Sequence, residues 1–239
     1  MTNNTRRAKQ GFTLIELTLA MAFIAILLLS ILYTTLHAGK LYTKGITNKT
    51  LNQIGREVTD TIRRDFTSTD PLRVLSPAPS GVGAAKSGRI CLGGATYVWN
   101  TAALLNSADS KLLYQDGALT KSVTFRRVLD SDGLLCQKDA TGKYLVTQIS
   151  SSMQSTDLLS GTGQDFAIYD LQFTRLGEKG GQGLYTMKLV IGTNAIDTTE
   201  TTADNVVLCK PPTDNQADFN YCSVAEFDIV LRAGGGQDD

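Results

Sequence analysis

Gly11-Phe12-Thr13-Leu14-Ile15-Glu16-Leu17, with the apolar run that continues to Leu36, decides the fold of this chain. There are 25 residues from Phe12 to Leu36, and Glu16 is the only charged one among them. About 20 apolar residues, at ~1.5 Å of helix each, are enough to cross a hydrocarbon layer of ~30 Å. The run therefore predicts a membrane-spanning helix with one carboxylate a single turn from its start.

Glu16 is the residue that this prediction has to explain. An ionisable side chain within lipid is costly and normally marks a function with a specific partner. Arg6, Arg7 and Lys9 lie just before the apolar run, where positive charge holds an N-terminus in the cytoplasm. A secretory signal peptide has a shorter apolar core and an A-x-A-like cleavage site, and this chain has neither. A plain signal-anchor helix stays open, but it gives no reason for Glu16.

The basic leader, the Gly11–Phe12 junction and the glutamate five residues after the glycine resemble the class III signal of type IV pilins and type II secretion pseudopilins. In that family a prepilin peptidase cleaves after the glycine, the new N-terminal residue is N-methylated, and the glutamate pairs with a terminal amine during filament assembly. The resemblance implies these roles for Gly11, Phe12 and Glu16. The charges agree with it, because an ammonium group at Phe12 and the Glu16 carboxylate would offset each other's desolvation.

Two departures from the major pilins favour a minor subunit. Major pilins commonly have a proline about two-thirds of the way through the membrane segment, where this chain has Tyr33. The part after Gly11 is also longer than a typical major pilin. We therefore expect a minor pilin of a type IV pilus, acting in adhesion, motility or DNA uptake. A minor pseudopilin of a type II secretion system stays open, as does a membrane-anchored surface-binding protein that never polymerises.

The resemblance also implies partners and a location. The partners are other pilin subunits, the prepilin peptidase, the inner-membrane assembly platform and the cytoplasmic membrane. The precursor is expected to cross that membrane once with its N-terminus inside, and the assembled subunit to lie in a pilus on the cell surface. The formal net charge of the chain is zero. This balance gives nucleic-acid binding no support across the whole chain and leaves only a local basic patch open.

All four cysteines follow the membrane segment, which places them in an exported, oxidising space where disulfides form. Four cysteines allow three pairings. We favour Cys209–Cys222, which closes a short polar loop, with Cys91–Cys136 as the second pair. Many pilins have a C-terminal loop bounded by a disulfide, so the resemblance supports the first pair.

The helix is predicted to continue well beyond the membrane segment, over Phe12–Phe66, because the first proline is Pro71. Apolar residues at helical spacing predict that its second half is amphipathic and needs a sheet to cover it. These residues are Leu51, Ile54, Val58 and Ile62.

After residue 88 the apolar pattern changes to a period of two, which predicts strands separated by Gly, Asp and Ser clusters. The predicted strands are Arg89–Leu92, Ala95–Asn100, Val123–Leu129, Tyr144–Ile149, Phe166–Thr174, Leu184–Ile191 and Val224–Arg232, with a hairpin loop over Gly177–Gly183. We expect an α+β fold in which the long N-terminal helix lies across an antiparallel sheet, as in the pilin family. Residues 101–165 are interpreted as an insertion that carries specificity.

The predicted divisions of the chain follow from these elements. Residues 1–11 are the leader, 12–36 the transmembrane or filament-core helix, and 37–70 the amphipathic half of the helix. A linker rich in Pro, Ser, Gly and Ala covers 71–88, and an exported β-rich domain covers 89–239.

No enzyme chemistry is predicted. His37 is the only histidine and lies where the helix leaves the membrane, so no Ser-His-Asp or Cys-His arrangement can form in the exported domain. We therefore expect no catalytic residues, no cofactor and no small-molecule substrate. Tyr97 and Trp99 share one face of a strand, where core packing or a subunit contact is favoured over a ligand platform.

Three further segments partly match phosphate-binding or calcium-binding motifs, and none is a convincing match. Ser80–Ser87 lacks the glycines and the following helix of a phosphate loop. Asp130–Gly133 begins like a calcium loop but lacks the later ligands, and is interpreted as a turn. Asp214, Asn215 and Asp218 could hold calcium, as in some pseudopilins, but solvated acids are common in loops. We expect no metal.

Overall fold

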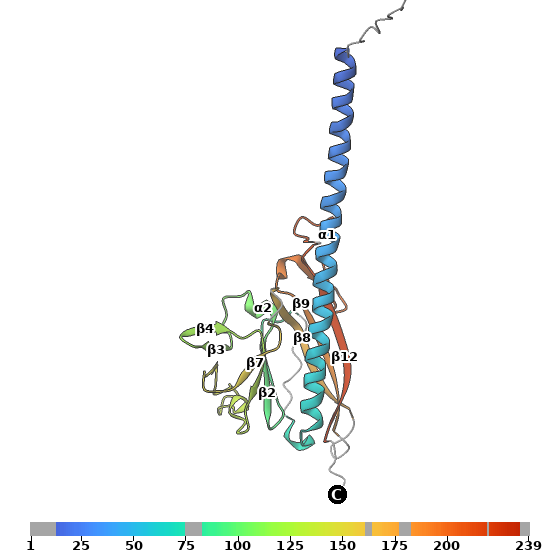
Figure 1. The fold of residues 1–239 in the computed structure, drawn as a ribbon. Helices are drawn as coiled ribbons and strands as arrows, with labels where there is room; N and C mark the ends of the chain where they lie inside the picture. The colour runs from blue at the N-terminus through green and yellow to red at the C-terminus, as the bar shows by residue number, and fades with distance from the viewer. Residues whose placement is uncertain (1–12, 75–82, 161–163, 177–182, 219, 235–239) are drawn as a thin grey trace, which may run out of the picture. The chain divides into compact units, whose positions relative to one another are not determined.

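The structure is a computed structural model that describes residues 13–74, 83–160, 164–176, 183–218 and 220–234 (Figure 1). It divides into two compact units, Met1–Thr43 and Lys44–Asp239, and the boundary falls inside the helix α1 (Leu14–Thr67). The long helix predicted from the sequence is therefore present as one element. The predicted leader, including Gly11, lies outside the described residues, and so does Phe12.

In the first unit, no described residue packs against the apolar side chains of α1. Every residue from Leu14 to Thr43 is exposed, although most of them are apolar. The exposed fraction is 81% for Leu14 and 68% for Phe23. Within the described part of the chain, α1 is the one helix long and apolar enough to cross a membrane.

In the second unit, α1 becomes amphipathic as predicted. Leu51, Ile54, Val58 and Ile62 are all at most 4% exposed, and they form one face with Phe66. Phe66 is fully buried, with its ring centroid 5.8 Å from that of Phe173 and 5.5 Å from that of Tyr185. Burying such a face contributes roughly 1.5–3 kcal/mol per large side chain relative to leaving it in water.

A three-stranded antiparallel sheet lies beside this half of α1 (Figure 1). Its strands, in the order β12-β9-β8, are β8 (Phe166–Leu176), β9 (Gly183–Thr193) and β12 (Val224–Ala233). Gly55 allows the helix to approach β12 closely, because a Cβ atom at this position would overlap the ring of Phe227.

A second, four-stranded antiparallel sheet completes the core. Its order is β1-β2-β5-β7, formed by β1 (Ser87–Cys91), β2 (Ala95–Asn100), β5 (Phe125–Leu129) and β7 (Ser155–Asp157). Tyr97, Trp99 and Phe125 join the core under α1, and Tyr97 and Trp99 are at most 1% exposed. Both residues therefore pack in the core and do not form a ligand platform.

An outer layer covers the other face of this sheet. It contains β3 (Leu113–Asp116), β4 (Leu119–Ser122) and β6 (Gln148–Ile149), in the order β4-β3-β6. Val98 and Val128 pack with Leu112, Leu135 and Ile149 in a second hydrophobic core. The remaining elements are α2 (Ala102–Leu105), β10 (Thr199–Thr201) and β11 (Val207–Cys209), with short 3-10 turns at Pro71–Arg73, Leu134–Cys136 and Ile196–Thr198.

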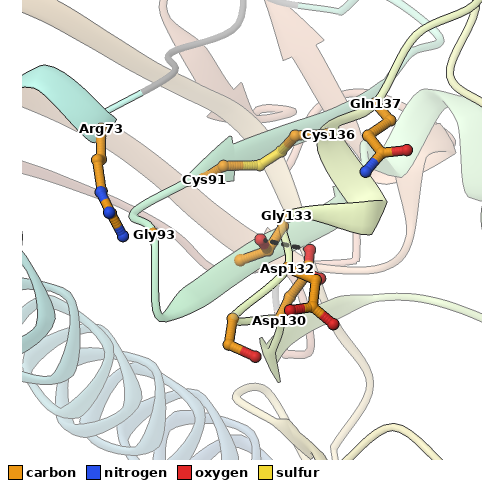
Figure 2. Close-up of a pocket in the computed structure, with 10 residues that line it drawn as sticks. Arg73, Cys91, Gly93, Asp130, Asp132, Gly133, Cys136 and Gln137 are labelled. Atoms are coloured by element: carbon orange, nitrogen blue, oxygen red, sulfur yellow. Dashed lines mark hydrogen bonds between the residues drawn. A yellow bond between two sulfur atoms is a disulfide. The ribbon is translucent and has the colours of Figure 1, made fainter.

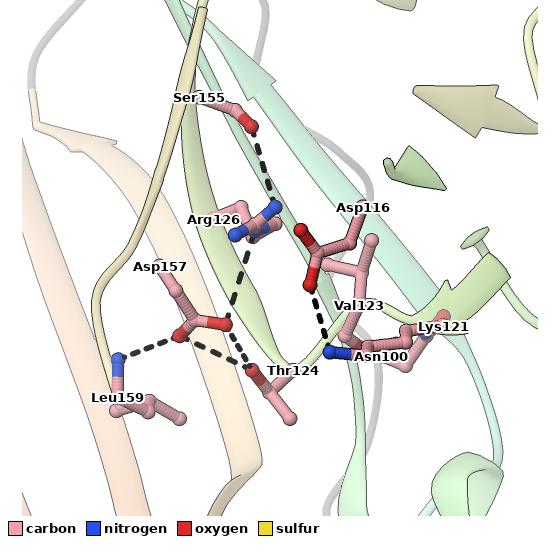
Figure 3. Close-up of polar contacts among 9 residues, drawn as sticks. All are labelled: Asn100, Asp116, Lys121, Val123, Thr124, Arg126, Ser155, Asp157 and Leu159. Atoms are coloured by element: carbon pink, nitrogen blue, oxygen red, sulfur yellow. Dashed lines mark hydrogen bonds and ion pairs between the residues drawn. The ribbon is translucent and has the colours of Figure 1, made fainter. Parts of the chain in front are cut away.

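Polar side chains attach the outer layer (Figure 3). The amide nitrogen of Asn100, a fully buried residue, donates to the carbonyl oxygens of Leu112 at 2.9 Å and Val123 at 2.7 Å. Its carbonyl oxygen accepts from the N–H of Leu112 at 3.0 Å. Arg126 lies 3.8 Å from a carboxylate oxygen of Asp157, which holds β5 to β7. The hydrogen bonds of Asn100 satisfy polar groups that would otherwise be costly to bury.

The structure corrects three parts of the predicted fold. The strands form four separate sheets instead of one, and β6 pairs with β3 in parallel. Only Gln148–Ile149 of the strand predicted over Tyr144–Ile149 is present, because the chain before it turns over Arg89 instead of pairing along a sheet. Strand β1 begins at Ser87, inside the predicted linker 71–88, and residues 75–82 of that linker lie outside the described part. Of the predicted hairpin loop, residues 177–182 also lie outside it.

One ion pair fixes the end of α1 to the four-stranded sheet. Arg127 donates from Nε to one oxygen of the Asp65 carboxylate at 2.6 Å and from Nη2 to the other at 2.9 Å. The Tyr97 hydroxyl donates to the same carboxylate at 2.6 Å. Burial and the adjacent carboxylate both raise the pKa of Tyr97, so its hydroxyl stays a donor at physiological pH. Asp65 therefore sets the register between helix and sheet.

Asp65→Asn is expected to lower the free energy of unfolding by about 2 kcal/mol, because Arg127 and Tyr97 lose their shared charged acceptor. Urea unfolding of the full chain in detergent measures this. The matched control is Asp60→Asn on the solvent side of α1, where the ion pair with Arg63 is largely exposed and should be worth less than about 1 kcal/mol. Equal losses of unfolding free energy in the two variants would contradict the role of Asp65 in joining the helix to the sheet.

Candidate functional site

The first turn of α1 contains a capping box. The backbone N–H and the hydroxyl of Thr13 donate to Oε2 of Glu16 at 2.9 and 2.8 Å, and the N–H of Glu16 donates to the Thr13 hydroxyl at 3.3 Å. Thr13 precedes the first helical residue, and Glu16 follows three positions later, which is the Thr-x-x-Glu pattern of a capping box. The sequence interpretation considered Glu16 only as the partner of an amine and missed this local role, although the four-residue pattern was readable.

The capping box leaves the Glu16 carboxylate able to take another partner. Both donors reach Oε2, and Oε1 accepts no hydrogen bond within the described part of the chain. Both hydrogen bonds come from neutral groups of Thr13, so they leave the negative charge of the Glu16 carboxylate in place. A negative charge in the first turn interacts favourably with the positive end of the helix dipole. The amide N–H of Thr13 is three covalent bonds from the nitrogen of Phe12. An ammonium group created at Phe12 would therefore arise beside this carboxylate.

The apolar surface after Glu16 is the largest unusual feature of the described chain. Soluble monomers rarely expose contiguous apolar patches of more than a few hundred Å². Here large apolar side chains are exposed on all sides of α1, from Leu14 at 81% to Leu41 at 50%. Tyr33 and His37 stack on one face, with ring centroids 6.4 Å apart. Such a segment needs lipid or other apolar helices around it.

The cysteines lie in the two pairs that the sequence favoured. Cys91 and Cys136 have Cα atoms 6.4 Å apart, and Cys209 and Cys222 have Cα atoms 5.9 Å apart. Both separations are in the range of disulfides, and both pairs are joined in the structure.

The loop closed by Cys209 and Cys222 contacts the packed half of α1. The Lys44 ammonium donates to the carbonyl oxygen of Cys222, and the hydroxyl of Ser223 donates to the side-chain oxygen of Asn48. Lys44 and Asn48 are one turn apart on the helix. The disulfide loop therefore holds the first turn of α1 in the second unit, so that helix and sheet are joined at this end as well as at Asp65.

The acids considered for metal binding accept hydrogen bonds from backbone N–H groups of their own loops. The carboxylate of Asp130 accepts from the N–H groups of Leu134 at 2.8 Å and Leu135 at 3.0 Å, which agrees with a turn. It borders a cavity of about 420 Å³ beside the Cys91–Cys136 disulfide (Figure 2). Asp218 accepts from backbone N–H groups of its own loop. Among the described residues no group of three or more His, Cys, Asp or Glu side chains is placed to hold a metal ion.

Among the described residues, one buried acid keeps a carboxylate oxygen without a hydrogen-bond partner. Asp170 on β8 is 1% exposed and follows a β-bulge at Ile168–Asp170. The side-chain amide of Gln172 donates to its Oδ2 at 2.7 Å, while Oδ1 has no partner within the described part. Burial raises the pKa of Asp170 to about 6, against the opposing hydrogen bond from Gln172. Its charge therefore costs stability at neutral pH.

No family model, no curated protein and no solved structure matches this chain. Function therefore has to be inferred from the chemistry of the chain itself, above all from the first turn of α1 and the apolar surface that follows it.

Removing either disulfide is expected to destabilise the chain, and the loss of stability should be larger for the disulfide that closes the longer loop. Because a cross-link restricts the unfolded chain more when it closes a longer loop, replacing Cys91 and Cys136 by serine should cost about 4 kcal/mol. Replacing Cys209 and Cys222 should cost about 3 kcal/mol. Urea unfolding of the full chain, with and without reductant, measures both. A larger loss for the shorter loop would contradict this ranking.

Asp170→Asn is expected to stabilise the chain by roughly 2 kcal/mol at pH 7.5, because it removes a buried charge. The native state holds the Asp170 proton up to a higher pH than the unfolded state does, so stability is lost as pH rises from about 4 to about 6. The gain from asparagine should therefore disappear below about pH 4. Thermal unfolding across this pH range measures it, with the exposed Asp132→Asn as control. A gain that does not change with pH would contradict the assignment.

Proposed function

We propose that this chain is a minor pilin-like subunit of a type IV pilus. It is made as a precursor in the cytoplasmic membrane with its N-terminus inside, is cleaved after Gly11 by a prepilin peptidase, and is methylated at Phe12. It then joins a filament through the apolar half of α1. The proposal rests on the resemblance at Gly11–Leu17, since no comparison with known proteins identifies a family.

The observation that carries the proposal is the combination of an exposed apolar first half of α1 with a single carboxylate in its first turn. A membrane anchor alone requires the apolar residues and not the acid. Helices that leave the bilayer to form a filament core lose lipid and must pack against one another. A buried carboxylate in such a core needs a cation, and cleavage after Gly11 supplies one on each subunit.

The second unit suits a subunit that adds surface to a filament. Its sheets hold α1 at two places, through Asp65 and through the Cys209–Cys222 loop. The packed half of the helix is thereby a fixed part of the exported domain. We propose that this domain presents its outer layer to neighbouring subunits or to an external partner.

A second candidate is a membrane-anchored surface protein that never polymerises. The capping box favours it, because the hydrogen bonds between Thr13 and Glu16 give the acid a structural role in an uncleaved chain. The two candidates differ in what they require of Glu16. Assembly requires its charge, whereas capping requires only an acceptor oxygen at that position.

Glu16→Gln separates them, because glutamine keeps an acceptor for Thr13 and loses the charge. In the assembly account, the amount of this variant in sheared surface fibres should fall at least tenfold while its amount in the membrane is unchanged. Thr13→Val is the matched control, since it removes the capping hydroxyl and keeps the carboxylate, and it should still be incorporated. Immunoblots of sheared fibres and membranes measure both fractions.

Normal incorporation of Glu16→Gln would contradict the charge pairing. Absence of the wild-type chain from sheared fibres would favour the non-polymerising anchor, and so would loss of function in Thr13→Val with none in Glu16→Gln.

A further inference from the structure

Strand β12 has one unpaired edge within the described part of the chain, because it ends the order β12-β9-β8. The N–H of Thr193 on β9 donates to the carbonyl oxygen of Ser223 at 2.9 Å, which makes them a hydrogen-bonded pair in the register of β9 with β12. In an antiparallel pair, every second residue of a strand bonds to the same neighbour, and the residues between them direct their backbone groups to the other side. The residues of β12 with backbone groups directed away from β9 are Glu226, Asp228, Val230 and Arg232.

The unpaired edge of β12 lacks the usual features that keep another strand away. Natural edge strands are commonly protected by a proline, a β-bulge or repelling charges. Strand β12 has no proline, and its pairing with β9 has no register shift, in contrast to the bulge of β8 at Ile168–Asp170. The side chains at the four outward positions are exposed, and that of Val230 is 59% exposed. A further strand can therefore add to this edge.

The charges of this edge complement a second copy of the same edge. In an antiparallel pair centred on Val230, Asp228 of each copy lies opposite Arg232 of the other. Neither of these residues forms an ion pair within the described part of the chain, whereas Glu226 already pairs with Lys188 at 2.8 Å. Opposite charges in directly opposed positions stabilise a strand pair, and like charges there destabilise it. A pair centred on Asp228 would place two carboxylates opposite each other.

The direction of α1 along β12 determines which copies can pair. Asn48 of α1 accepts from the hydroxyl of Ser223, just before β12 begins. Pro71, which follows α1, lies beside Gly234, just after β12 ends. The packed half of α1 and β12 therefore run in the same direction. An antiparallel pair of β12 strands places the N-terminal ends of the two packed helices at opposite ends of the joined sheet. Two chains anchored in one membrane cannot pair in this way, whereas chains in two facing membranes can.

We propose that β12 is a homophilic contact, which binds a second copy of this chain anchored in a facing membrane. The outward backbone groups join the two strands into one antiparallel sheet, and the Asp228–Arg232 pairs set its register. One such contact is small, so the link between two membranes depends on many chains acting together. This contact goes beyond the proposed assembly function, since it needs the membrane segment but neither cleavage nor Glu16.

The test is the clustering of phosphatidylcholine vesicles that contain the full chain, measured by dynamic light scattering. Wild-type vesicles should cluster, and less so as salt rises. Asp228→Lys and Arg232→Glu each place like charges opposite each other in both charge pairs, so each should lower clustering at least fivefold. Vesicles with the first variant, mixed with vesicles that contain the second, should cluster again, because all opposed charges are then of opposite sign.

The matched control is Glu200→Lys, which makes the same change of net charge as Asp228→Lys on the exposed part of another strand, β10. It should leave clustering unchanged. All three substituted side chains are exposed, and circular dichroism checks that the variants are folded. The proposal would be overturned by wild-type vesicles that do not cluster, or by single reversals that cluster like the wild type. It would also be overturned if the mixture of the two folded variants did not recover, or if Glu200→Lys lowered clustering as much as Asp228→Lys.

Discussion

The structure depends on apolar surface that the chain does not cover by itself. One helix of 54 residues is apolar on all sides over its first part and amphipathic over its second. The second part is covered by the two sheets of the core, through Leu51, Val58 and Phe66. Among the described residues the first part has no such cover, which is consistent with a segment that crosses a membrane. The location and partners that we propose start from this requirement.

The second unit is organised to hold the packed half of the helix. Asp65 joins it to Arg127 and Tyr97 at its C-terminal end, and Lys44 joins it to the disulfide loop near the unit boundary. The outer layer packs on the far face of the four-stranded sheet and makes a core of its own.

Sequence patterns predicted the elements whose burial is regular. The apolar run, the amphipathic spacing of Leu51 to Ile62 and strand Ala95–Asn100 were predicted correctly. The outer layer was missed, because β3 and β4 are short, largely exposed and without an alternating apolar pattern. The contacts of Arg89 with Leu135 and Val146 could not be predicted, since these residues are 46 and 57 positions away from it in the sequence. The capping box at Thr13 and Glu16 was readable in the sequence and was overlooked.

The central claim is that Glu16 acts beside an ammonium group that proteolysis creates at Phe12. Mass spectrometry of the N-terminal peptide, from chain recovered in sheared surface fibres, tests this most directly. The account predicts a peptide that begins at Phe12 and carries one methyl group on its amine. A chain that begins at Met1, or one cut elsewhere in the leader or the helix, would contradict it.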